Sequence, residues 1–459
     1  MPETEKRPEK LPGPARWLLL ILLVFAALVP SGCRQAPITS LSFKPFTPAE
    51  LLSHEIRIDP ETTGTPVESE RYQELMEVTS GIRGLDFLQP VRFVALSREA
   101  LGLYLLDVMS SEVEDADIEA DERMLAALGL LPEGGDLKKT MLGVLTEQIA
   151  GSYDTSSKLI TLVEGGPGET MDDITIVHEL VHALQDQHFN LEEPPLEDDA
   201  HNSDTRLAIL SLIEGDAMYT MEQYIADHVD LEELLLEVME TSYSMNLLKE
   251  APVYIQKSLL FPYQEGERFA RALVKQRGFE ELDAAFRDPP LSTIQVMYPA
   301  RYLDRREPPR TVTLPDLSQE GQGWTLRKSD IMGAFDVNTW FEVFSGLLVS
   351  REVSRAWAGN CIDLYLDENG EQMLVNLFAW DSQESARAFL GDYRELLENR
   401  FEDEVEAGGS TPDSFLVTAD GELFYCGRVD DLTLCLQAPD TASLEHALEK
   451  LGDFPRVPR

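Results

Sequence analysis

The stretch His178-Glu179-Leu180-Val181-His182 constrains the fold and the chemistry of this chain more than any other. In an α-helix successive residues are rotated by about 100°, so His178 and His182 would lie on one face, about 40° apart. Two neutral imidazoles at this spacing can bind one metal ion, and the neighbouring Glu179 could take a proton from water beside it. The pattern therefore predicts a helix that carries a metal site.

The alternative is a chance pattern on an exposed helix, and the surrounding sequence counts against it. Histidine is scarce, with 7 in 459 residues, yet His178, His182 and His188 fall within eleven positions. Asp172 and Asp173 suit the N-terminus of a helix. The apolar residues that follow are spaced as on one buried helix face: Ile174, Val177, Val181 and Leu184. We therefore expect the helix to be buried and its histidines to bind metal.

A catalytic zinc site needs a third protein ligand and an open position for water. His188 follows the first histidine by ten residues, the spacing of the third histidine in metzincins, but Gln185 stands where those enzymes have a glycine. In a helix that continues through Gln185, His188 would be rotated by about 80° and lie almost three turns away, too far to share the ion. A site with His188 is the metzincin-like alternative.

Glu214 is the better candidate for the third ligand. It follows the apolar stretch 207–213 and precedes Gly215, where a second helix could approach closely. A carboxylate on a helix that faces the histidine pair would complete a His-His-Glu site. We therefore predict that His178, His182 and Glu214 bind Zn²⁺.

An HExxH pattern followed by Glu-Gly-x-Ala, here residues 214–217, resembles the gluzincin metallopeptidases. The resemblance covers about residues 75–312. It is strongest to bacterial membrane-anchored or secreted proteins with the pattern HELxHALQDQHF, here residues 178–189. It implies an α+β fold with a mainly helical metallopeptidase domain and a small edge sheet, in which Glu179 is the general base.

Two flanking segments extend this resemblance. Residues 151–154 and 159–163 are expected to form two strands around a polar turn, and in gluzincins a strand at this point pairs with an extended peptide substrate. Downstream, Tyr263-Gln264-Glu265-Gly266 resembles the Tyr-x-x-Gly segment of gluzincin aminopeptidases. That likeness implies that the Tyr263 hydroxyl stabilises the developing oxyanion. The alternative is that Tyr263 is a packed aromatic residue at a helix start, after Pro262.

The chain departs from the gluzincin pattern at one position. Many gluzincins have an aspartate four residues after the glutamate ligand, where it orients a histidine ligand. Here that position is Met218. Asp216 and Asp186 are the candidates to replace this aspartate, and the spacing does not choose between them.

Residues 1–33 have the pattern of an export segment. A basic flank precedes residues 17–29, an uncharged run of thirteen apolar residues that is shorter than the roughly 20 needed to span a bilayer. Pro30-Ser31-Gly32-Cys33 resembles a bacterial lipobox, which implies that Cys33 is lipidated, and an uncleaved anchor is the alternative. Both place the protein in the cell envelope, outside the cytoplasm and attached to a membrane. The proline-rich residues 34–75 are expected to be a linker.

The C-terminal residues 313–459 are expected to form an accessory α+β sheet domain after the metallopeptidase domain, residues 76–312. Strands are predicted at 361–366, 372–380, 415–418, 422–429 and 432–436, and helices at 382–400 and 441–451. Cys426 and Cys435 flank a predicted hairpin, where a disulfide and two reduced thiols fit equally well. Cys361 is expected to be a free thiol.

Composition limits the partners. Lys and Arg number 38 against 83 Asp and Glu, so the formal net charge is −45, which disfavours nucleic-acid binding. The sequence therefore predicts a membrane-anchored zinc peptidase with peptide or protein substrates. The alternative function is that of a non-catalytic envelope lipoprotein with a structural or decayed metal site, in which the C-terminal domain binds a partner.

Overall fold

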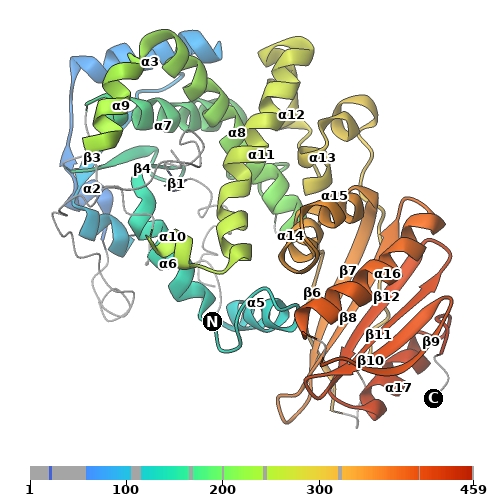
Figure 1. Ribbon diagram of the computed structural model, residues 1–459. Helices are drawn as coiled ribbons and strands as arrows, with labels where there is room; N and C mark the ends of the chain where they lie inside the picture. The colour runs from blue at the N-terminus through green and yellow to red at the C-terminus, as the bar shows by residue number, and fades with distance from the viewer. Residues whose placement is uncertain are drawn as a thin grey trace, which may run out of the picture.

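The computed structural model describes residues 20–22, 58–104, 115–164, 169–198, 201–240, 246–318, 323–402 and 404–456. Within these residues the chain combines helices with two sheets, so the predicted α+β class is confirmed. A mainly helical part with a small sheet comes first, and a part built on a larger sheet follows it (Figure 1).

The small sheet packs against the helix that carries the HExxH pattern. Its strand order is β1-β4-β5-β3-β2. β4 (Ile149–Asp154) is antiparallel to β5 (Leu159–Val163), which pairs in parallel with β3 (Arg92–Leu96), and β2 (Thr65–Pro66) lies at the far edge. On the other side of β4 lies β1 (Leu20–Leu22), also antiparallel. The two strands predicted before the HExxH helix are thus confirmed as β4 and β5.

Four long helices and the short α12 surround the core of the first part: α3 (Glu70–Arg83), α7 (Glu169–Phe189), α8 (Ser203–His228), α11 (Val253–Arg277) and α12 (Phe279–Arg287). The apolar face predicted for α7 is buried in the core that these helices share with the sheet, where Ile174 and Val177 are completely enclosed. Shorter helices complete this part: α2 (Pro60–Thr63), α5 (Asp115–Ala127), α6 (Leu137–Gln148), α9 (Leu231–Glu240), α10 (Asn246–Glu250), α13 (Thr293–Met297) and the π-helical turn η3 (Arg301–Arg305).

Helices α8 and α11 touch backbone to backbone at a pair of glycines. A Cβ atom added at Gly215 of α8 would lie 2.2 Å from the carbonyl oxygen of Gly266 of α11. One added at Gly266 would lie 2.2 Å from the carbonyl oxygen of Ser211. Any side chain at these positions would force the two helices apart. Because Glu214 is next to Gly215, this contact also sets the position of the predicted carboxylate ligand.

Replacing Gly215 with alanine is expected to lower the free energy of unfolding by about 1–3 kcal/mol, the usual cost of overpacking a closed contact. Urea unfolding of the purified protein measures this loss. Gly391→Ala is the matched control, because Gly391 lies within helix α16 (Gln383–Arg400) and an added Cβ there has no neighbour within 4 Å. That change should raise stability by about 0.5–1 kcal/mol through better helix propensity. Equal effects of the two substitutions would contradict a closed contact at Gly215.

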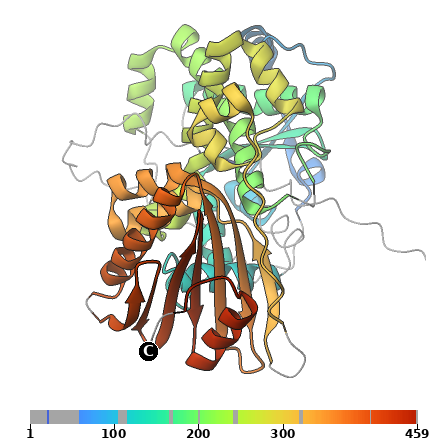
Figure 2. The same cartoon turned by 90° about the vertical axis from the view of Figure 1, so that its right-hand side faces the viewer.

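The C-terminal part is a seven-stranded antiparallel sheet with helices on both faces (Figure 2). Its strands lie in the order β6 (Thr325–Asp330), β7 (Trp357–Leu366), β8 (Gln372–Trp380), β12 (Leu432–Ala438), β11 (Glu422–Val429), β10 (Ser414–Ala419) and β9 (Glu406–Thr411). Helices α14 (Ala334–Ser345), α15 (Leu347–Ala356) and α16 pack on one face, and α17 (Thr441–Lys450) packs on the other. The strands and helices predicted for this region are confirmed, with small shifts at their ends.

Two segments of the first part differ from expectation because helix formation extends into them. The predicted linker, residues 34–75, contains α2, β2 and the start of α3. Pro60 is the first residue of α2, where proline's missing amide costs nothing. Residues 112–122 are so acidic that the sequence favours a solvated patch there, yet residues 115–122 belong to α5, because Ala120 and Met124 anchor that helix in the core.

Two helix boundaries were also misplaced. Pro262 lies inside α11, so Tyr263 is in the middle of a helix and not at its start. The helical periodicity of residues 269–286 predicts one helix, but the structure divides this stretch at Gly278 into the end of α11 and α12. Gly278 has a φ of 74°, which a residue with a side chain rarely adopts.

The two cysteines of the predicted hairpin face each other across β11 and β12. Cys426 and Cys435 are directly opposed in the strand register, and their Sγ atoms lie 3.0 Å apart. Both are buried free thiols in this structure, and Cys361 is a half-buried free thiol. The spacing keeps a disulfide between Cys426 and Cys435 within reach in an oxidising compartment.

The described helices include none that is long and apolar enough to cross a membrane. The apolar run 17–29 falls outside the described residues except for β1, and Cys33 falls outside them altogether. The export segment and its lipid or apolar anchor therefore stay predictions from the sequence.

Candidate metal centre

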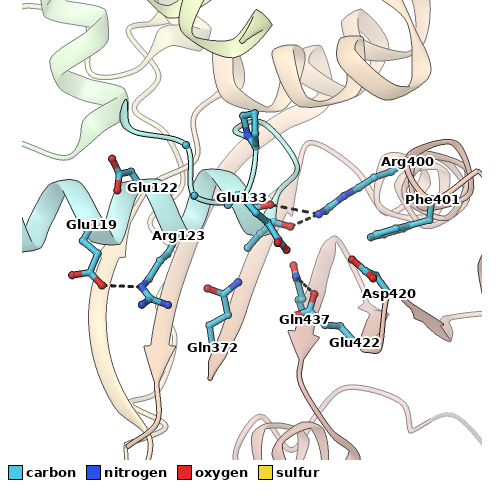
Figure 3. A pocket seen from close by; sticks show the side chains of 15 residues that line it. Glu119, Glu122, Arg123, Glu133, Gln372, Arg400, Phe401, Asp420, Glu422 and Gln437 are labelled. Carbon is cyan, nitrogen blue, oxygen red and sulfur yellow. Dashed lines mark hydrogen bonds and ion pairs between the residues drawn. The ribbon is translucent and has the colours of Figure 1, made fainter. Parts of the chain in front are cut away.

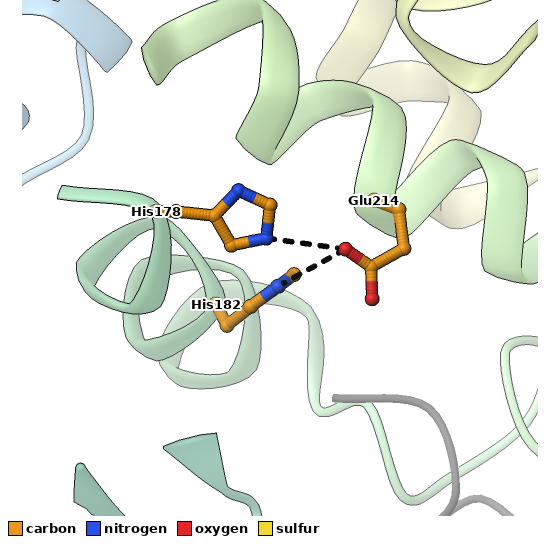
Figure 4. Close-up of side chains that lie close together, drawn as sticks. All are labelled: His178, His182 and Glu214. Carbon is orange, nitrogen blue, oxygen red and sulfur yellow. Dashed lines mark hydrogen bonds and ion pairs between the residues drawn. The ribbon is translucent and has the colours of Figure 1, made fainter. Parts of the chain in front are cut away.

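Two helices bring the three predicted ligands together. His178 and His182 lie on the face of α7 that meets α8, and Glu214 lies on α8 (Figure 4). Glu214 Oε2 is 3.1 Å from His178 Nε2 and 3.5 Å from His182 Nε2. One candidate ligand atom from each residue lies within 4.8 Å of the other two, so a single ion can contact all three.

The group is enclosed, and several of its polar atoms are unpaired. No side chain of the three is more than 1% exposed. His182 Nε2, Glu214 Oε1 and both carboxylate oxygens of Glu179 have no hydrogen-bond partner among the described residues. A buried polar atom without a partner costs about 1–3 kcal/mol, so four of them around one point are unusual in a core. A cation and a polar ligand bound between them would remove this cost.

Burial and mutual charge set the ionisation of the group. Burial raises the pKa of Glu179 to about 8, although the charge of His182 and the Tyr153 backbone favour its ionised form. Burial also lowers the pKa of His178. For His182 the effect of burial is outweighed by the Glu214 carboxylate, which raises the pKa of His182 to about 9. Against the same burial, the two histidines lower the pKa of Glu214. A divalent cation would take the place of the proton that His182 holds beside Glu214.

The donor set fits Zn²⁺ better than a hard cation. Two imidazole nitrogens and one carboxylate oxygen are a usual set for catalytic zinc, whereas Mg²⁺ and Ca²⁺ prefer oxygen ligands alone. Within the described residues the group contains three such side chains and no fourth His, Cys, Asp or Glu. A tetrahedral ion held by these three would keep one position for water or a substrate oxygen.

The two predicted catalytic residues lie beside the ligands. Glu179 is fully buried on α7, close enough for its ionisation to respond to His182 and Glu214. Tyr263 reaches the site from α11, and its ring centroid lies 6.4 Å from that of His178. Tyr263 is 6% exposed. Both the packed aromatic and the oxyanion role predicted for it therefore fit its place in the structure.

His188 does not join the ligand group. It lies in the last turn of α7, where its Nε2 is 2.8 Å from the carbonyl oxygen of Asp86 and its ring contacts Phe189. The helix continues through Gln185, as the absence of a glycine predicts, so the rotation along α7 carries His188 away from the first two histidines.

The side chain that orients His182 is one that the sequence did not single out. His182 Nδ1 lies 2.9 Å from Gln185 Oε1, and Gln185 Nε2 donates to Asp216. Asp186 instead accepts hydrogen bonds from the Tyr153 hydroxyl and from Lys158. Gln185 follows His182 by three positions, a spacing that puts both side chains on one helix face. This spacing is the feature of the sequence that could have indicated a contact between them.

A hollow that contains none of these residues lies between α5 and the larger sheet (Figure 3). It has a volume of about 390 Å³ and a strongly charged lining. Arg123 pairs with Glu119, Arg400 donates to the Ala127 carbonyl, and Gln437 donates to Glu422. These three contacts pair part of the charged lining of the hollow within the protein itself.

Comparison with known proteins matches only the C-terminal part. A family described as "Domain of unknown function (DUF8575)" matches residues 324–447, which span β6 to β12 and most of α17. The chain has no match among curated proteins or among solved structures. The matched residues contain none of the candidate ligands, so the metal centre is interpreted from its own geometry.

Proposed function

We propose that this protein is a zinc-dependent peptidase of gluzincin type, anchored to a membrane and active outside the cytoplasm. The observation that carries this proposal is the meeting of His178, His182 and Glu214 from two helices, with the unpaired carboxylate of Glu179 beside them. A peptidase that activates water needs both features: a set of ligands with one position open, and a base that is not itself a ligand.

The residues divide the chemistry between them. His178, His182 and Glu214 would hold the zinc ion, which when bound acidifies water and polarises the scissile carbonyl. Glu179 takes the proton of the attacking water and passes it to the leaving amine. Burial raises the pKa of Glu179, which favours the protonated form that the group must adopt between these two transfers. Tyr263, whose ring centroid lies 6.4 Å from that of His178, would donate a hydrogen bond to the oxyanion.

β4 lies between β5 and the short strand β1, and the side that β1 occupies shows how an extended peptide would pair with this sheet. β4 packs against α7, and the backbone of its Tyr153 influences Glu179 directly. β1 pairs antiparallel with β4, with Leu20 opposite Ser152 and Leu22 opposite Ile149. A peptide substrate that took the place of β1 would have its backbone fixed next to the base. This pairing therefore supports peptides or proteins as the substrate class.

The second candidate function is a binding module with a structural metal site. It is favoured by the enclosure of the ligands, none of which is more than 1% exposed. In that case the C-terminal sheet domain would bind the partner, and the ion would only hold α7 and α8 together. Three ligands instead of four favour the peptidase, because structural zinc sites usually have four protein ligands.

Removal of the metal distinguishes these functions. Purified wild-type protein is expected to contain about one zinc per chain and to cleave unfolded casein or a peptide library. Dialysis against a chelator should abolish cleavage, and added Zn²⁺ should restore it. Fold is followed by circular dichroism throughout. Zinc without cleavage of any peptide would favour the binding module with a structural metal site. A chain without zinc would contradict the peptidase and the structural site, and would leave the binding module with a decayed site.

A further inference from the structure

We infer that Gln185 is a positioning residue of the candidate metal centre, fixed in its own place by Asp216 and Arg83. It holds His182 in the tautomer whose Nε2 is free to bind the cation. The inference rests on the proposed function, since it concerns a ligand of the same site.

Every polar atom of the Gln185 side chain has a partner. Oε1 lies 2.9 Å from His182 Nδ1. Nε2 donates to the carbonyl oxygen of Ile213 at 2.9 Å and to Asp216 Oδ2 at 3.0 Å. Both acceptors belong to α8 and stand on either side of Glu214 in the sequence. Gln185 is completely buried, so water does not compete for these bonds.

These partners leave only one orientation for the amide group. A carbonyl oxygen and a carboxylate paired with arginine can only accept hydrogen bonds, so the NH₂ group must face Ile213 and Asp216. Oε1 must then face His182, and because it too can only accept, His182 Nδ1 must carry a proton. With Nδ1 protonated, the proton that a cation displaces from His182 is the one on Nε2, and the lone pair is then at this nitrogen, which faces Glu214.

Asp216 is itself held by a buried arginine. Arg83 Nε donates to both carboxylate oxygens of Asp216, at 2.8 and 3.0 Å, and Nη2 donates to Asp283 at 2.6 Å. Arg83 also lies over the ring of Phe279, 4.9 Å from its centroid. These contacts connect α3 and α12 to the amide of Gln185. They leave that amide little freedom to turn away from His182.

The two histidines differ in this respect. His178 Nδ1 has no hydrogen-bond partner among the described residues, whereas His182 Nδ1 has Gln185. Met218 stands where an aspartate could have supplied a partner in a gluzincin-like site. Of the two histidine ligands, therefore, His182 has a described side chain that orients its ring through a hydrogen bond, and His178 does not. Loss of Gln185 should weaken metal binding without removing a ligand.

The test compares full-length wild type with Gln185→Met, which keeps the length of the side chain but cannot hydrogen-bond. Gln295→Met is the matched control. Gln295 is also a buried glutamine with both ends bonded, to the Leu291 amide and the Glu307 carbonyl, and it touches neither histidine. The zinc dissociation constant, measured by competition with a chromogenic chelator, should rise about 10- to 100-fold for Gln185→Met. For Gln295→Met it should stay at the wild-type value.

A second readout reports the tautomer directly. In zinc-loaded protein with ¹⁵N-labelled histidine, His182 should show a slowly exchanging proton on Nδ1, and in Gln185→Met that proton should exchange with water. Gln185→Asn serves if the methionine variant is unstable, because it keeps the amide but is too short to reach both His182 and α8. It should also weaken zinc binding.

The outcomes separate the two hypotheses. Wild type that binds no zinc would contradict the proposed function. Wild type that binds zinc, with Gln185→Met or Gln185→Asn binding it equally well and keeping a protected Nδ1 proton, would contradict the positioning role alone. A selective loss of affinity in the Gln185 variants, absent in Gln295→Met, supports that role.

Discussion

Replacing Glu179 with glutamine is expected to lower kcat/KM for peptide hydrolysis by about 10²- to 10⁴-fold, the range that a general base contributes. Glutamine has nearly the shape of glutamate, so the core around α7 should keep its packing. It cannot take a proton from water, so hydrolysis would lose its base. Because Glu179 is outside the ligand group, the zinc content of the variant should equal that of wild type.

The measurement is the rate of cleavage of a fluorogenic peptide, with zinc quantified in the same samples. Glu281→Gln is the control, because Glu281 is only 8% exposed and pairs with Arg277 and Arg306, away from the histidines. It should leave kcat/KM unchanged. An active wild type whose Glu179→Gln variant is equally active would show that another group is the base.

Replacing Glu214 with alanine is expected to remove zinc from the purified protein. Two imidazoles alone hold the ion poorly, so the loss of affinity should exceed the 10- to 100-fold effect typical of a residue that only orients a ligand. Cleavage activity should disappear with the metal. Inductively coupled plasma mass spectrometry of the protein after gel filtration gives the zinc content.

His188→Ala is the companion variant, because it tests the metzincin-like alternative. His188 bonds to the Asp86 carbonyl and lies outside the ligand group, so zinc content should be unchanged. The reverse pattern, with zinc lost from His188→Ala and kept by Glu214→Ala, would reassign the third ligand. Zinc kept by both variants would mean that neither side chain binds it.

Much of this arrangement could be predicted from sequence because it depends on helix periodicity. The spacing of His178 and His182 fixes them on one face of α7, and the same periodicity excludes His188. The position of Glu214 was harder to predict, because the neighbouring sequence does not indicate which face of α8 packs against α7. It was found through Gly215, whose missing side chain indicates a close helix approach, and the structure places Gly266 at that point.

The elements that sequence reasoning missed depend on long-range contacts. α5 is rich in acidic residues, yet it is a helix because its few apolar side chains reach a distant core. Pro262 does not begin α11, because tertiary packing of the turns on either side keeps that helix continuous. For Gln185 the sequence offered one indication, its position three residues after His182. Its role depends on Asp216 and Arg83, which are 31 and 102 positions away in the chain.

The glycine contact between α8 and α11 also limits how this chain can vary in evolution. Glu214 lies one residue before Gly215, and Tyr263 lies three residues before Gly266. The direction in which each functional side chain points is therefore fixed by its distance along the helix from the glycine contact. A single-residue insertion between either pair would rotate that side chain by about 100° around its helix. Insertions and deletions should therefore accumulate in the connection between the two helices, and the short spacings at the crossing should stay constant.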